Sequence, residues 1–259
     1  MDFSNRTALI TGSGQGVGEG IARALASYRA NVCLVGRTFS KVEAVANDIN
    51  KDGGSAIAIE CDVKNIESIH SSVQGTLLKF NSLNILINNA QEVPLGNILD
   101  VTDESFVNGW DSGPLATFRF MKACHPHLIG GGKIINLASS SALRPDSNSY
   151  GAYAAVKESI RSLSRAAAVE WGHDNILVNC IMPLAKSAGM DWWMNEHPVE
   201  ANEFLKTIPL GRVGDCKDDI GEAVCHILSD GMNYITGSTI CLLYTSDAAD
   251  EGLGVDLGG

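Results

Sequence analysis

The stretch Thr7-Ala-Leu-Ile-Thr-Gly-Ser-Gly-Gln-Gly-Val-Gly18 decides the fold class. Its first five residues form a short, mainly apolar run, which is typical of a strand covered on both faces. Four glycines follow at alternate positions, and apolar residues then recur at helical spacing as far as Tyr28. A glycine turn between a strand and a helix lets a pyrophosphate approach the helix N-terminus. A turn of purely structural use is the alternative.

The same alternation continues along the chain. Further apolar runs predict strands at residues 31–35, 55–61, 83–87, 133–137, 176–181 and 239–243, with helical spacing between most of them. Strands that alternate with helices imply right-handed crossovers and a parallel sheet. The sequence therefore predicts an α/β fold: a single doubly wound domain with a seven-stranded, mainly parallel sheet and helices on both faces.

Composition limits the partners. The 259 residues carry a net charge of −11 and no lysine or arginine cluster, so nucleic acid is not an expected partner. No apolar segment reaches the roughly 18 residues of a membrane helix, and no signal segment opens the chain. The seven cysteines are scattered without Cys-x-x-Cys spacing, which indicates reduced thiols. We therefore expect a cytoplasmic protein. We expect no metal site, because no further ligand completes the Cys124-His-Pro-His127 cluster.

The end of the second strand bears on the cofactor. An acidic residue there would accept hydrogen bonds from the adenosine ribose, but the chain has Gly36-Arg37. Because arginine can fork onto a 2′-phosphate, NADP(H) is favoured over NAD(H). A solvent-facing arginine is the alternative. Asp62-Val63, after the third strand, is placed near the adenine ring.

Tyr153 and Lys157 are the candidate proton-transfer pair. Residues i and i+4 share one face of a helix, so the ammonium is expected beside the phenol. An unperturbed tyrosine titrates near ~10, and a neighbouring cation favours its ionised form. Tyr150 is the nearest competitor, but Ala154 stands four residues after it.

Five motifs occur in order: Thr11-Gly-x-x-x-Gly-x-Gly18, Asn88-Asn-Ala90, a serine after the fifth strand, Tyr153-x-x-x-Lys157 and Asn179-x-x-x-Pro183. With these motifs the chain resembles the short-chain dehydrogenase/reductase family over roughly residues 5–242. The resemblance implies a Rossmann-type domain, expected to span residues 1–243, with a substrate flap at about 184–212. Residues 244–259 depart from the family pattern and are expected to be an atypical tail outside the fold.

The resemblance also implies residue roles. Tyr153 would be the general acid in reduction and the base in oxidation, Lys157 would lower its pKa, and Ser139 would hold the substrate oxygen. Counting thirteen residues back from Tyr153 favours Ser140 instead, unless residues 146–149 hold an insertion. The implied cofactor-binding residues are Gly12, Ser13, Gln15, Gly16, Val17, Gly18, Arg37, Thr38, Asp62, Val63, Asn89, Ala90, Tyr153, Lys157, Pro183 and Ser187. The implied activity is NADP(H)-dependent interconversion of an alcohol and a ketone or aldehyde.

Three positions depart from the family pattern. Gly113 stands where many members carry an asparagine that supports a proton-relay water, Gln91 replaces the glycine usual after Asn88-Asn-Ala90, and Leu184 replaces the glycine usual after Pro183. These departures keep open an alternative, a catalytically impaired member that binds nucleotide in a regulatory role. A sugar-nucleotide epimerase would need a substrate domain for which this chain has no room.

The flap suggests the substrate. Met190, Trp192, Trp193 and Met194 suit a bulky apolar ring, so a hydrophobic cyclic alcohol or ketone is the expected substrate. Packing of these side chains on the protein itself is the alternative. In relatives the helix that carries the tyrosine and the helix before it pack against other subunits in a homodimer or homotetramer. Its apolar stripe here serves either the core or such an interface; the stripe is Val156, Ile160, Leu163 and Ala167.

Overall fold

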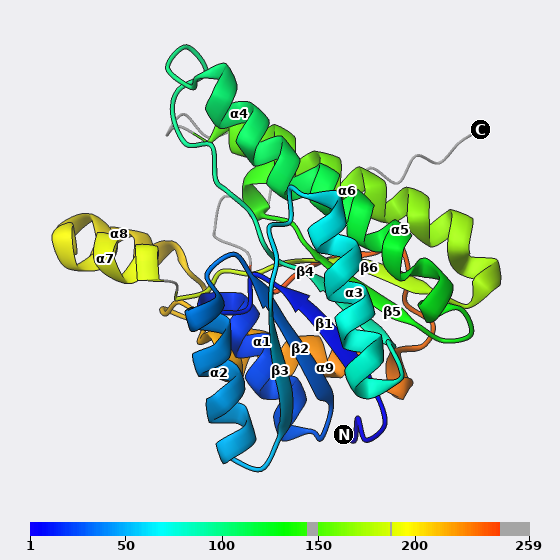
Figure 1. The fold of residues 1–259 in the computed structure, drawn as a ribbon. Helices are drawn as coiled ribbons and strands as arrows, with labels where there is room; N and C mark the ends of the chain where they lie inside the picture. Colours follow the sequence, from blue (N-terminus) through cyan, green and yellow to red (C-terminus); the bar gives the residue numbers. More distant parts are fainter. Residues whose placement is uncertain (144–149, 187, 244–259) are drawn as a thin grey trace, which may run out of the picture.

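The computed structural model describes residues 1–143, 150–186 and 188–243. Seven strands form one sheet in the order β3-β2-β1-β4-β5-β6-β7 (Figure 1), and every neighbouring pair is parallel. The prediction of a doubly wound, seven-stranded α/β sheet is confirmed. The strands are β1 (Thr7–Thr11), β2 (Asn31–Gly36), β3 (Ser55–Glu60), β4 (Ile85–Asn88), β5 (Lys133–Leu137), β6 (Leu177–Met182) and β7 (Thr239–Cys241).

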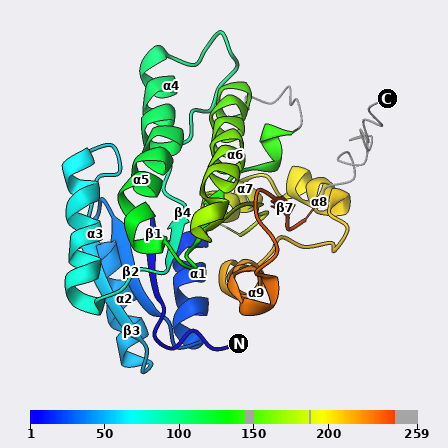
Figure 2. The ribbon, with the colours of Figure 1, turned by 90° about the vertical axis from the view of Figure 1, so that its right-hand side faces the viewer.

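Helices cover both faces of the sheet (Figures 1 and 2). Alternate residues of a strand point to opposite faces, so Ala8 and Ile10 of β1 join one apolar cluster and Leu9 joins the other. The first cluster includes residues of α1 (Gly16–Ser27), α2 (Phe39–Lys51) and α9 (Glu222–Leu228). The second includes residues of α3 (Ile66–Phe80), α5 (Ala116–Leu128) and α6 (Gly151–Trp171).

The strand order reverses between β1 and β4, and this position is where ligands bind in open α/β sheets. The loops after these two strands are tied together. The Thr11 hydroxyl accepts hydrogen bonds from the backbone N–H groups of Asn89 (2.9 Å) and Ala90 (3.0 Å). Gly12 has a φ of 63°, and a Cβ there would lie 2.9 Å from the Ala90 Cα. Only glycine fits this close approach.

Helix α5 continues an earlier helix of the chain. Thr102 caps α4 (Asp103–Trp110), and its hydroxyl accepts a hydrogen bond from the Ser105 N–H at 3.1 Å. A π-helical turn, η1 (Asp111–Leu115), joins α4 to α5 and contains Pro114. Proline lacks an N–H, and the Ser112 hydroxyl donates to the Asn108 carbonyl at 2.6 Å in the preceding turn.

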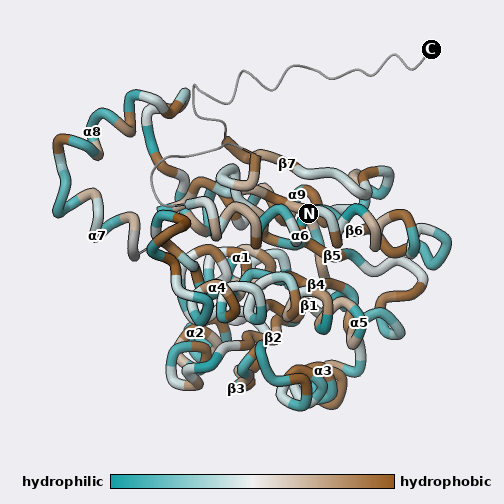
Figure 3. Tube along the Cα trace, turned by 90° about the horizontal axis from the view of Figure 1, so that it is seen from above, coloured by the Kyte–Doolittle hydropathy of each residue, from teal (hydrophilic) through white to brown (hydrophobic). Residues whose placement is uncertain are grey.

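The expected flap contains two helices, α7 (Ala188–Glu196) and α8 (Pro198–Thr207), which project beside the sheet (Figure 3). A second π-helical turn, η4 (Cys216–Gly221), leads directly into α9, and β7 ends at Cys241, two residues before the predicted end at 243. Short 3-10 turns are η2 (Ser140–Ala142), η3 (Gly172–Asp174) and η5 (Asp230–Met232). Within the described ranges no helix is long and apolar enough to span a membrane.

The apolar stripe of α6 serves the core. Val156, Ile160 and Ala167 are each at most 5% exposed within this single chain, and the partly buried Leu163 packs on the second cluster. Burial against the sheet thus settles the alternative between core and interface that the sequence left open.

Candidate active site

A cavity of about 240 Å³ lies beyond the carboxyl ends of the first strands. It is lined by several of the predicted cofactor-binding residues: Gly12, Gln15, Arg37, Thr38, Asp62, Val63 and Ala90. Gly16 has a φ of 60° and open space where a Cβ would stand, so the backbone at the start of α1 can be approached closely. A cavity walled by glycines at a helix N-terminus fits a dinucleotide.

Three other residues of the glycine loop hold its shape. A Cβ on Gly18 would lie 2.5 Å from both the Asn89 Nδ2 and the Gly12 carbonyl oxygen. Ser13 is fully buried: its hydroxyl donates to the Ile10 carbonyl and accepts from the Val35 N–H, each at 2.9 Å. Val17 packs against the core. The Ser13 side chain is therefore committed to the fold and does not face the cavity.

Arg37 lines the cavity with a side chain that is 58% exposed and forms an ion pair. Its Nη1 is 2.5 Å from the Glu92 Oε1, and the Lys64 Nζ lies 3.1 Å from the same oxygen. Glu92 and Lys41 line the cavity, but the sequence motifs did not single out either residue. Glu92 follows the Asn88-Asn-Ala90 motif by two residues, so proximity along the chain was the one signal available.

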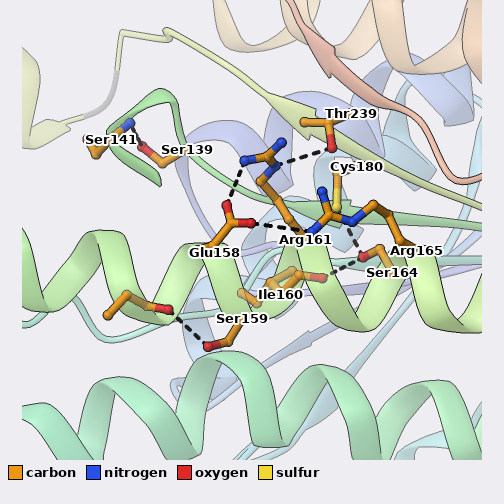
Figure 4. Close-up of polar contacts among 11 residues, drawn as sticks. Ser139, Ser141, Glu158, Ser159, Ile160, Arg161, Ser164, Arg165, Cys180 and Thr239 are labelled. Atoms are coloured by element: carbon orange, nitrogen blue, oxygen red, sulfur yellow. Dashed lines mark hydrogen bonds and ion pairs between the residues drawn. The ribbon is translucent and has the colours of Figure 1, made fainter. Parts of the chain in front are cut away.

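Ser139, Tyr153 and Lys157 meet where β5 ends and α6 begins. The Lys157 Nζ donates to the carbonyl of Leu137, the last residue of β5, at 2.6 Å. The same Nζ lies 5.7 Å from the Tyr153 ring centroid. Ser139 is hydrogen-bonded to Tyr153. The Ser139 hydroxyl also accepts a hydrogen bond from the Ser141 N–H at 3.2 Å, as Figure 4 shows. Ser140 is exposed.

Side-chain contacts attach α6 to the last strands (Figure 4). The Ser164 hydroxyl donates to the Ile160 carbonyl at 2.7 Å and accepts from the Cys180 thiol on β6 at 3.0 Å. Arg161 Nε donates to the hydroxyl of Thr239 on β7 at 3.3 Å. These contacts and the buried stripe fix the rotation of the helix that presents the tyrosine and lysine.

Burial dominates the electrostatics of the pair. It lowers the pKa of Lys157 to about 7. Burial also raises the pKa of Tyr153 above its ordinary value, while the hydrogen bond with Ser139 acts in the opposite direction. The expectation that the tyrosine pKa is lowered is thus wrong, because loss of hydration outweighs the hydrogen bond with Ser139.

Of the other predicted residues, some support the fold and some do not line the cavity. Asn179 is buried, and its Nδ2 donates to the Ile235 carbonyl at 2.8 Å, so it holds the approach to β7. Asn89 supports the loop after β1, and Pro183 follows β6 without lining the described cavity. Ser187, residues 146–149 and the expected tail from 244 to 259 lie outside the described residues.

The two flap tryptophans differ: one packs on the protein itself, and the other is exposed and free to contact a substrate. Trp193 packs edge-on against Phe204 with ring centroids 5.8 Å apart and so connects α7 to α8. Trp192 is 63% exposed.

His125 pairs with Asp174 at 2.9 Å and contacts the Trp171 ring, which is an ordinary helix-end role. Over the described parts of the chain, no group of three potential ligands is placed to hold a metal ion.

Comparison with known proteins places this geometry in a family. The profile of the family described as enoyl-(acyl carrier protein) reductase matches residues 12–242. The chain belongs to the short-chain dehydrogenase/reductase family. It is an oxidoreductase of the class that acts on CH–OH groups with NAD(P).

Three relatives of this dehydrogenase/reductase illustrate the range. A 12alpha-hydroxysteroid dehydrogenase from a Clostridium species is 36% identical, over 93% of this chain and 96% of the relative. A 3-oxoacyl-acyl-carrier-protein reductase from Chlamydia trachomatis is 31% identical, over 91% and 95%. The crystal structure of a candidate short-chain alcohol dehydrogenase from Sinorhizobium meliloti superposes with a TM-score of 0.86 at 31% identity, covering 93% of this chain and 96% of that one.

Proposed function

We propose that residues 1–243 form one catalytic domain that reduces a ketone on a hydrophobic ring with NADPH and catalyses the reverse oxidation at higher pH. The convergence of Ser139, Tyr153 and Lys157 at the end of β5 supports this proposal. A regulatory, non-catalytic role is less well supported, because the serine, the tyrosine and the lysine of the family motif are all present and lie close together. The bound nicotinamide would supply or accept the hydride.

The residues divide the remaining work. The Ser139 hydroxyl donates a hydrogen bond to the carbonyl oxygen, and Tyr153 gives its proton to that oxygen as negative charge develops there. A raised tyrosine pKa keeps the phenol protonated near neutral pH, which suits an acid in the reducing direction. Oxidation of an alcohol needs the phenolate and is therefore expected to accelerate with rising pH.

Arg37 supports NADP(H) over NAD(H), but Glu92 opposes it. A 2′-phosphate at Arg37 would have to displace the Glu92 carboxylate, which also repels it. Replacing Arg37 by alanine is expected to weaken NADPH binding roughly tenfold or more, the size of a lost charge-assisted hydrogen bond, and to leave NADH binding nearly unchanged. Replacing Glu92 by glutamine is expected to tighten NADPH binding selectively.

Fluorescence titration of both cofactors measures these dissociation constants. The control is Arg29→Ala, which removes an exposed arginine that pairs with Asp2 just before β2, whereas Gly36 and Arg37 line the cavity at the other end of that strand. Equal losses for NADPH and NADH in Arg37→Ala, or tighter NADH binding by the unmodified protein, would remove the preference for NADP(H).

Ser139 rather than Ser140 is proposed as the substrate-binding serine. Because Ser139 contacts Tyr153 while Ser140 is exposed, alanine at 139 is expected to lower kcat by roughly 10²-fold, as loss of an oxyanion donor does. Alanine at 140 is expected to change kcat less than about threefold, since exposed hydroxyls contribute little. Steady-state kinetics of both variants decides, and the opposite ranking would assign the role to Ser140.

A ring-shaped apolar substrate is proposed from the exposed Trp192 on the flap and from the steroid activity of the Clostridium relative. The direct experiment follows NADPH consumption with a panel containing a 12-keto steroid, cyclohexanone and a small 2-keto acid. Reduction of the steroid or cyclohexanone is expected. Turnover confined to the charged keto acid would contradict the proposed substrate class.

A homodimer or homotetramer is also proposed. Phe106, Val107 and Trp110 on α4 and Phe118 on α5 are each at least 38% exposed, which is a patch suited to a second copy. Light scattering coupled to size-exclusion chromatography tests the oligomeric state, and a monomer at micromolar concentration would contradict the proposal.

A further inference from the structure

A second cavity lies at the edge of the sheet opposite the cofactor cavity. Its volume is about 380 Å³, and its lining includes residues at or just before the starts of β1, β4, β5 and β6. Because these strands are parallel, their amino ends meet at one edge, whereas the cofactor cavity lies beyond carboxyl ends. The second cavity is therefore separate from the site of the proposed reaction.

Two cationic side chains line this second cavity. Lys133, the first residue of β5, is 5% exposed, and Arg6 is partly buried. Burial lowers the pKa of Lys133, the nearby charge of Arg6 lowers it further, and the charge of Asp230 raises it by less. Asp230 carries the one carboxylate among the described lining residues and is largely exposed. The repulsion between the two cations is thus not fully offset by the protein itself.

Both cations have unused hydrogen-bond donors. The Lys133 Nζ donates to the carbonyls of Leu228 (2.9 Å) and Ser229 (2.8 Å), which caps α9 and uses two of the three N–H groups of an ammonium. The Arg6 Nη2 donates to the Asp230 Oδ1 at 2.5 Å, and a guanidinium has five N–H groups. Within the described chain neither side chain has a further hydrogen-bond acceptor. An oxyanion can therefore bind Lys133 without displacing the carbonyls at the end of α9.

The rest of the lining is open and polar. Gly130 and Gly131 have φ angles of 92° and 136°, and no atom lies within 4 Å of the position that a Gly130 Cβ would take. A ligand can therefore approach the backbone of this turn closely. Amide and imidazole groups are contributed to the lining by Asn84, His127, Asn175 and Asn233. A molecule larger than a bare oxyanion would thus find polar partners for its remainder.

We propose that this cavity binds a small polar anion, whose phosphate or carboxylate group is held between Arg6 and Lys133. Arginine pairs with both groups through charge-assisted hydrogen bonds, so the shared chemistry is that of an oxyanion. The bound anion would compete with Asp230 for Arg6 and would reduce the repulsion between the two cations. Binding at this edge of the sheet requires neither the dinucleotide nor turnover, so it does not depend on the proposed ketone reduction.

Calorimetric titration of the ligand-free protein with inorganic phosphate tests the site, with succinate titrated in parallel and the ionic strength held constant with sodium chloride. We expect saturable binding that Arg6→Gln weakens about tenfold or more, the size of a lost charge-assisted hydrogen bond. Asp230→Asn removes the competing carboxylate and should tighten binding by up to about fivefold, the scale of an exposed ion pair. Saturable binding of either anion with these changes supports the site, and the tighter anion identifies the group that the ligand carries.

The glycine loop at the start of α1 can also attract phosphate, so the titration needs a matched control at the other cavity. Arg37→Ala is expected to leave the Kd for phosphate at the second cavity unchanged, because Arg37 lines the cofactor cavity alone. Lys133→Met should weaken binding as Arg6→Gln does, and should it fail to fold without its α9 contacts, the Arg6 and Asp230 variants still decide. Absence of saturable binding of both anions, or an unchanged Kd in Arg6→Gln, would overturn the inference.

Discussion

Phenylalanine at position 153 is expected to lower kcat for ketone reduction by about 10²- to 10⁴-fold, the usual contribution of a positioned acid or base. The substitution removes the phenolic O–H that contacts Ser139 and leaves the ring in place. NADPH binding and the free energy of unfolding should change little. Stopped-flow absorbance of NADPH oxidation, with a fluorescence titration of the cofactor, measures both quantities.

The matched control is Tyr150→Phe, because Tyr150 packs edge-on against Tyr153 with centroids 6.1 Å apart. That variant should keep turnover within a few-fold, since its hydroxyl has no place in the proposed proton transfer. In the unmodified protein, alcohol oxidation should rise with pH over the alkaline range, because burial raises the pKa of Tyr153 and the base form appears only there. An oxidation rate independent of pH would count against Tyr153 as the base.

Methionine at position 157 is expected to abolish most turnover and to stabilise the ligand-free protein below neutral pH. Lys157 has a pKa of about 7 in the folded protein and an ordinary lysine pKa when unfolded, so the unfolded state binds more protons between about 7 and 10.5. The free energy of unfolding of the unmodified protein therefore rises with pH across that window. Below it, the folded protein holds a buried charge, which methionine removes.

Urea unfolding at a series of pH values measures this difference. At pH 6 the Lys157→Met variant should be more stable, by on the order of 1–4 kcal/mol, as when a buried charge is replaced by an apolar group. The difference should shrink as pH approaches 10. Lys51→Met, at the exposed end of α2, is the control and should show no such window. A variant less stable than the unmodified protein at pH 6 would show that the ammonium is well compensated in the fold.

Most of the fold could be predicted because it follows from local pattern. The run from Thr7 to Thr11 is buried throughout, as its apolar sequence predicts for an inner strand. Gly12 and Gly16, which follow it, have positive φ angles, as the predicted turn requires. What could not be predicted depends on pieces far apart in sequence. The π-helical turn at Asp111–Leu115 arises where Pro114 interrupts a continuing helix, and its Ser112 bonds to Glu92.

The candidate site divides in the same way. Tyr153 and Lys157 stand four positions apart on one helix, and this spacing was enough to predict that the ammonium lies near the ring, where the Nζ is 5.7 Å from the ring centroid. Glu92 opposite Arg37, and Gln91 against Gly113, are pairings across 55 and 22 positions of the chain that no spacing rule reveals. The direction of the Tyr153 pKa shift also needed the structure, because burial is set by the surrounding elements and not by the neighbouring lysine.

Hydride transfer from NADPH carrying deuterium at both C4 positions of the reduced ring tests the central claim most directly. With a 12-keto steroid or cyclohexanone as acceptor, mass spectrometry should find one deuterium on the carbinol carbon of the product, formed by the unmodified protein and almost absent with Tyr153→Phe. A product without deuterium, or equal labelling by both proteins at equal rates, would contradict carbonyl reduction with Tyr153 as the acid.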